Sequence, residues 1–73
     1  MTEENIIELA RCLTRVFKIY KRQKNPVEKQ KWLENLRAYC FTFQSACNEF
    51  YHEEKRADEW LRYIGEKEKN RKQ

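Results

Sequence analysis

Apolar side chains recur at intervals of three and four residues over the first third of the chain. The recurring positions are Ile6, Leu9, Leu13, Val16 and Tyr20. Because this spacing places side chains on one face of an α-helix, it predicts a helix over about residues 4–23. Thr2, followed by Glu3 and Glu4, suits the start of this helix, and the basic residues near its end suit the negative pole of the helix dipole.

A second helix is predicted to begin almost directly afterwards, at the sequence KNPVEK. Asn25 can cap this helix, Pro26 fits its first position, and Glu28 stands where the acid of a capping box belongs. Only a very short break then separates the two helices, and such a break normally connects antiparallel neighbours. The sequence therefore predicts an antiparallel helical hairpin.

The apolar pattern of the second helix meets no further glycine or proline until Gly65. A repeat of 3.5 residues is typical of a helix that packs along other helices in left-handed coiled-coil fashion. It predicts one long helix over about 26–64, with Gly65 as its C-cap and residues 66–73 as a disordered basic tail. The repeating positions are Leu33, Leu36, Cys40, Phe43, Cys47, Phe50, Glu54, Ala57, Leu61 and Ile64.

The acidic segment 52–59 leaves an alternative to this long helix. The helical positions that are apolar elsewhere become acidic there, at Glu53 and Glu54, and Asp58 could cap a short third helix. A helix of nearly forty residues is also far longer than the usual dozen. The sequence thus favours a continuous second helix, with a break near 52–57 as the alternative.

The unequal lengths of the two helices have a consequence for association. At about 1.5 Å per residue the first helix is about 30 Å long, so it can cover the second only as far as about Cys47. The apolar residues beyond need cover, either from the end of the same chain or from a second chain. We expect self-association, most simply a two-fold dimer in which one all-α domain per chain, residues 1–65, joins a helical bundle. The expected interface residues are Phe43, Cys47, Phe50, Tyr51, Trp60, Leu61 and Ile64.

Composition agrees with a small helical protein. The 73 residues contain one glycine and one proline, whereas a sheet of many strands needs more such residues for its turns. Three cysteines cannot all pair within the chain, the N-terminus MTEENIIELA lacks the features of a signal peptide, and no apolar run is long enough to span a bilayer. We therefore expect a cytoplasmic protein with reduced thiols that does not interact with membranes.

The cysteines and the single histidine do not have the spacing of a reactive site. Cys40 and Cys47 are seven residues apart, about 10 Å along a helix, and His52 points about 140° away from Cys47. Metal ligands and nucleophile–base pairs need closer side chains. We expect the cysteines to fill the core, and we expect no catalytic residues, metal, cofactor or small-molecule substrate.

Positive charge is concentrated on the first helix and the following turn. Residues 11–31 carry eight Lys or Arg against the single Glu28, a net +7 in a chain whose total is +4. Spacings of four, three and four residues place four of them on a ridge opposite the apolar face. The ridge residues are Arg11, Arg15, Lys18 and Arg22, and Lys21 extends the positive field.

This basic ridge has three interpretations: an ordinary solvated face, a contact surface for an acidic protein, or a site for nucleic-acid phosphates. Phe41 is a further candidate contact, because it lies opposite the apolar face of its helix. We expect a non-enzymatic, oligomerising helical protein that acts by protein–protein interaction, as a regulator, inhibitor or assembly factor. The alternative is a nucleic-acid-binding protein that uses the ridge and the basic tail.

Overall fold

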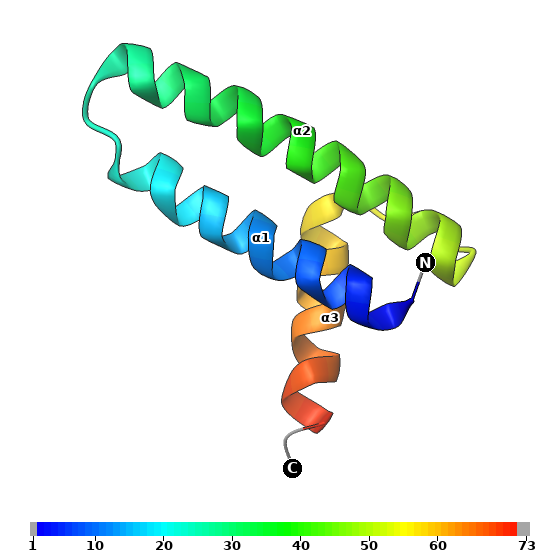
Figure 1. The fold of residues 1–73 in the computed structure, drawn as a ribbon. Helices are drawn as coiled ribbons and strands as arrows, with labels where there is room; N and C mark the ends of the chain where they lie inside the picture. Colours follow the sequence, from blue (N-terminus) through cyan, green and yellow to red (C-terminus); the bar gives the residue numbers. More distant parts are fainter. Residues whose placement is uncertain (1, 72–73) are drawn as a thin grey trace.

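The computed structural model describes residues 2–71, and these residues form three α-helices and no strand. The helices are α1 (Glu3–Arg22), α2 (Pro26–Tyr51) and α3 (Ala57–Arg71). α1 and α2 run side by side in opposite directions, and α3 lies across one face of this α1–α2 pair (Figure 1). The all-α class that the sequence predicts is confirmed.

Local side-chain contacts explain where α1 and α2 begin. The hydroxyl of Thr2 accepts a hydrogen bond from the backbone N–H of Asn5, at 3.3 Å. The side-chain oxygen of Asn25 accepts from the N–H groups of Val27, at 2.8 Å, and of Glu28, at 3.4 Å. Each cap satisfies N–H groups that have no partner inside the helix. Asn25 is therefore the cap that the sequence predicts, and only residues 23–25 separate the two helices.

The expectation of a single helix over 26–64 needs correction, because α2 ends at Tyr51. His52 adopts the left-handed conformation, with φ 55° and ψ 40°, and its N–H bonds to the carbonyl of Asn48. The N–H of Glu53 bonds to the same carbonyl, at 3.3 Å. The break falls where acidic residues replace the apolar positions, so that continuing the helix would bury no additional apolar surface. The structure has the broken alternative.

Residues 66–71 also differ from the expectation of a disordered tail, because they continue α3 beyond Gly65. Gly65 is exposed inside the helix and does not cap it. Two ion pairs tie this part of α3 to α1: Lys67 to Glu3, at 3.4 Å, and Glu68 to Arg11, at 2.9 Å. The two ion pairs hold this polar part of α3 against α1. Residues 72 and 73 of the expected tail lie outside the described residues.

The core forms where the three helices meet. Its largest fully buried side chains are Ile6, Leu13, Phe43, Cys47, Trp60 and Ile64, two from each helix. Four of these six are among the residues that the sequence assigned to a dimer interface, and the other three of that set, Phe50, Tyr51 and Leu61, pack half-buried against the core. In the structure, α3 of the same chain covers the apolar surface that a second chain was expected to cover. Dimerisation stays a prediction, but burial of these residues removes the reason for it.

The side chain of Asn48 connects the end of α2 to α3. Its Oδ1 accepts a hydrogen bond from the indole Nε1–H of Trp60, at 2.7 Å, and another from the backbone N–H of Lys55, at 3.1 Å. One turn earlier on α2, Oε1 of Gln44 accepts from the N–H of Ala57, at 3.2 Å. The two amide side chains therefore position both the connection and the first residue of α3.

Aromatic rings and two lysines surround the junction between the end of α2 and the start of α3. The ring of Tyr51 stacks on Trp60 with centroids 5.0 Å apart, and Tyr63 meets both rings edge-on. Nζ of Lys55 lies 5.0 Å from the centroid of the Trp60 ring, and Nζ of Lys67 lies 5.1 Å from the centroid of the Tyr51 ring. The negatively polarised faces of the rings attract the lysine ammonium groups, most strongly where water is excluded. Burial raises the pKa of the Tyr51 hydroxyl above its ordinary value of 10.0.

Replacement of Asn48 tests the importance of the junction. Asn48→Ala removes the acceptor of a buried indole N–H, and we expect it to lower the free energy of unfolding by about 1–3 kcal/mol. Asn35→Ala, at an exposed position of the same helix, should change it by less than about 0.5 kcal/mol. Urea unfolding followed by circular dichroism measures both. In a Trp60→Phe background, which lacks the indole donor, Asn48→Ala should cost less; an equal cost in both backgrounds would contradict the role of this hydrogen bond.

The mass of the protein in solution separates the two expectations for association. The sequence predicts two chains, whereas a chain whose apolar residues are covered by its own α3 needs no second copy. From the structure we expect the mass of one chain in light scattering at micromolar concentration. In a Trp32→Phe variant the fluorescence of the fully buried Trp60 should resist quenching by acrylamide. A two-chain mass would instead favour a dimer, formed by exchange of α3 or by another surface.

Candidate interaction surface

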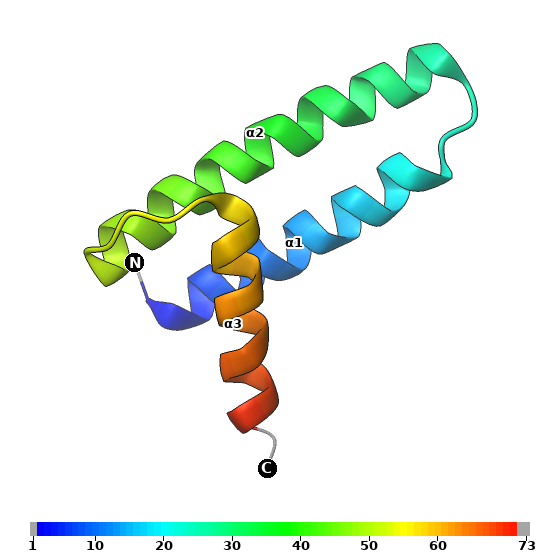
Figure 2. The same cartoon turned by 180° about the vertical axis from the view of Figure 1, so that it is seen from behind.

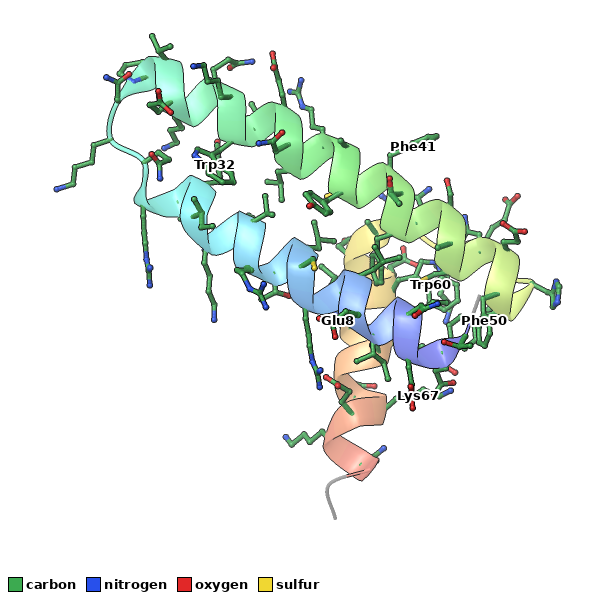
Figure 3. All side chains as sticks on the ribbon, in the orientation of Figure 1. Glu8, Trp32, Phe41, Phe50, Trp60 and Lys67 are labelled. Atoms are coloured by element: carbon green, nitrogen blue, oxygen red, sulfur yellow. The ribbon has the colours of Figure 1, made fainter. Side chains whose placement is uncertain are left out.

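The basic residues that the sequence singles out on α1 are all exposed in the structure. They are Arg11, Arg15, Lys18, Lys21 and Arg22, here called the basic surface. α1 uses its apolar side chains, with Ile6 and Leu13 at the centre, for the core. The basic side chains are therefore left in solvent. Figure 3 shows nitrogen-tipped side chains that extend from α1 on the side away from α2.

Only part of this positive charge is compensated within the chain. Arg11 pairs with Glu68 of α3, at 2.9 Å, and with Glu8 of its own helix, at 3.6 Å. Among the described residues, no acidic side chain forms an ion pair with Arg15, Lys18 or Arg22. The charge of these three residues is available to a partner.

A groove lies between α1 and α3 next to these residues. It has a volume of about 360 Å³. On its α1 side it is lined by Thr14, Arg15 and Lys18, and on its α3 side by Leu61 and Ile64. The Arg11–Glu68 ion pair lines it as well. This α1–α3 groove thus combines an apolar side with a positively charged one.

A second hollow, here called the apolar pocket, adjoins the groove. All three helices contribute to it: Leu13 and Phe17 of α1, Leu36 and Cys40 of α2, and Leu61 of α3. Its volume is about 310 Å³, and its lining is almost entirely apolar. Thr14 and Leu61 line both hollows. The groove and the pocket therefore lie next to each other, and the two together are here called the depression.

Phe17 forms part of the outer wall of the apolar pocket. Its side chain is 42% exposed. Nζ of Lys21 lies 4.5 Å from the centroid of its ring. Phe17 thus places an apolar side chain among the basic residues of α1, although it is not one of the recurring apolar positions of that helix.

The structure brings together only some of the candidate contact residues. Arg11, Arg15 and Lys18 line the groove, whereas Lys21 and Arg22 line neither hollow. Phe41 is 75% exposed on α2 and points away from α1 (Figure 3), so it is not part of the same surface.

Sequence reasoning named Leu61 and Ile64 but assigned them to a dimer interface, and it did not place them beside Thr14 of α1. The apolar Phe17, which stands outside the recurring apolar positions of α1, is the feature of the sequence that points to the pocket. The contribution of α3 had no local signal, because it depends on where α3 folds back.

The three cysteines differ in burial, and all are free thiols. Cys47 is fully buried in the core, while Cys12 and Cys40 are partly exposed. Burial raises the pKa of Cys47 from 9.0 to about 11 and raises that of Cys40 as well. The thiolate is the reactive form, so both the burial and the pKa protect Cys47 from alkylation.

Alkylation of the native protein should therefore distinguish the cysteines. At pH 8 a thiol with a pKa of about 11 is ionised to roughly one part in a thousand. We expect Cys12 and Cys40 to react with iodoacetamide first and Cys47 only as the chain unfolds, measured by mass spectrometry of tryptic peptides. In urea all three should react at similar rates. Equal rates for Cys47 and Cys12 in the native protein would contradict the burial of Cys47.

Comparison of the chain with protein-family models, with curated proteins and with solved structures gave no match. Within residues 2–71, no helix combines the length and the apolar character needed to cross a bilayer. In the same part of the chain, no three His, Cys, Asp or Glu side chains are grouped so that they could hold a metal ion. The surface formed by the basic residues of α1, the α1–α3 groove and the apolar pocket is the feature from which a function can be inferred.

Proposed function

We propose that this chain is a small, non-enzymatic cytoplasmic protein that acts by binding another protein, as a regulator, inhibitor or assembly factor. The basic surface of α1 is the contact region, and the partner presents an acidic surface to it. The observation that carries the proposal is the uncompensated charge of Arg15 and Lys18 beside the apolar residues Leu61 and Ile64.

The mixture of charge and apolar surface favours a protein over a nucleic acid. Protein interfaces combine an apolar centre with a polar rim, and arginine and aromatic residues are enriched in them. A phosphate backbone would use the charges but leave the half-buried Leu61 of the groove without a partner. Bases stack on exposed rings, and the highly exposed ring of Phe41 lies on α2, outside the basic surface.

The part of the tail described by the structure also gives little support to the nucleic-acid alternative. Lys67 pairs with Glu3, and Glu68 pairs with Arg11, so this segment is engaged with α1 instead of extending freely. A protein partner needs only the surface of α1 and α3. Complementary charge would speed its association and select against basic partners.

Reversal of charge on the basic surface tests this function. Arg15→Glu/Arg22→Glu should reduce at least tenfold the amount of a specific protein that the immobilised chain retains from a cell extract, because the acidic partner is then repelled. Arg37→Glu/Arg62→Glu changes the net charge equally at exposed positions of α2 and α3 that line neither hollow and should retain that protein as the wild type does. Quantitative mass spectrometry measures the difference.

Two other outcomes would contradict the proposal. Identical retention by all three forms would mean that the basic surface is only solvated. Retardation of duplex DNA or RNA that is lost in Arg15→Glu/Arg22→Glu and falls steeply with salt would favour nucleic acid as the partner.

A further inference from the structure

α3 covers only half of the α1–α2 pair. Figure 2 shows it crossing near the N-terminal end of α1, while the half of the same face next to the α1–α2 turn has no helix over it. The apolar pocket lies at the edge of the covered half, because residues of α3 form one of its sides and Phe17 and Leu36 form the side toward the turn. α3 thus forms a third layer over one half of the α1–α2 pair, and the pocket lies at the edge of this layer.

Positive charge lies beside the pocket, on the groove residues Arg15 and Lys18. Two acids line the depression and each has a basic partner: Glu68 of the groove pairs with Arg11, at 2.9 Å, and Asp58 of the pocket pairs with Arg56, at 4.0 Å. Arg15 and Lys18 have no such partner among the described residues. The segment 11–31, which leads from the groove through the turn into α2, carries a net +7. A ligand that covers the pocket therefore gains from negative charge along its edges.

We propose that the apolar pocket and the α1–α3 groove bind an acidic amphipathic helix of a partner protein. The helix inserts a large apolar side chain between Phe17 and Leu61 and places carboxylates against Arg15 and Lys18. This inference rests on the proposed function and names the kind of segment that the partner contributes.

The dimensions of the depression suit a helix. Arg11 and Lys18 are seven residues apart on α1, about 10 Å, or about two turns of a partner helix. Because Thr14 and Leu61 line both hollows, apolar side chains spaced by three or four residues can enter the pocket and the groove from one face of that helix. Acids on the flanks of the same face then meet the basic residues.

A defined peptide tests this site. The probe is a fluorescein-labelled peptide of about 18 residues, five helical turns, with leucines on one face and glutamates on its flanks. Fluorescence anisotropy should show binding with a Kd of about 10 μM. A scrambled peptide of the same composition, which has no apolar face, and a peptide with lysine in place of glutamate should each bind at least about tenfold more weakly.

Thr14→Trp provides the matched variant, because it fills the boundary of the two hollows without changing the charge. Thr14 is exposed, so the fold should persist, which circular dichroism checks. We expect the variant to weaken the amphipathic peptide at least about tenfold. Ser45→Trp introduces the same residue at an exposed position of α2 that lines neither hollow, and it should change the affinity by less than about twofold.

Cys40 reports occupation of the pocket in the unmodified protein. The bound peptide should slow its alkylation at least about fivefold, whereas Cys12, which lines neither hollow, should react as before. Equal protection of both thiols, or of neither, would contradict binding at this place.

The remaining outcomes separate this inference from the proposed function. If the scrambled peptide binds as well as the amphipathic one, or Thr14→Trp has no effect while Arg15→Glu/Arg22→Glu still does, an acidic partner is bound by charge alone and the inference fails. No binding of the probe up to about 1 mM overturns the inference, while the retention experiment decides the function independently. Binding of oleate or of phosphatidylglycerol vesicles that Thr14→Trp abolishes, without binding of the peptide, would assign the site to a lipid.

Discussion

The hydrogen bond between the indole of Trp60 and the side chain of Asn48 is the constraint on which the rest of this structure depends. A fully buried indole N–H needs an acceptor, and Asn48 offers one at 2.7 Å from the last full turn of α2. The same oxygen accepts from Lys55, so the acceptor also fixes the connection. With Trp60 held there, α3 lies across the ends of α1 and α2 that meet in the core.

The position of α3 decides the surface of the molecule as well as its core. It brings Leu61 and Ile64 next to α1, and it brings Glu68 to Arg11. The ion pair is partly exposed and contributes little to stability by itself, but it takes one arginine out of the basic surface and leaves Arg15 and Lys18 for a partner. Without α3 the basic surface would be a row of cations on a solvated helix. With α3 in place, its residues Arg11, Arg15 and Lys18 form one side of the groove.

A concentration of like charge has a cost for the folded chain. The net +7 of residues 11–31 raises the free energy of the compact state through repulsion. Among the described residues, two acids from outside this segment, Glu8 and Glu68, pair with Arg11, and Lys21 and Lys29 lie over the rings of Phe17 and Tyr20. A partner that neutralises this charge would stabilise the fold by mass action. The arrangement is therefore consistent with a protein that is most stable when bound.

Local sequence determined the all-α class, the start of α1 and α2, and the apolar face of α1, because caps and a spacing of three and four residues act between neighbours. Asn25 and the core residues Ile6 and Leu13 were evident in this way. The end of α2 was not decided locally, since Glu53, Glu54 and Asp58 suit either a solvated helix or a break. The tertiary structure decided it: the break lets Trp60 and Ile64 return to the core of their own chain. The groove and the pocket follow from that return, because their sides come from helices whose contact no local pattern encodes.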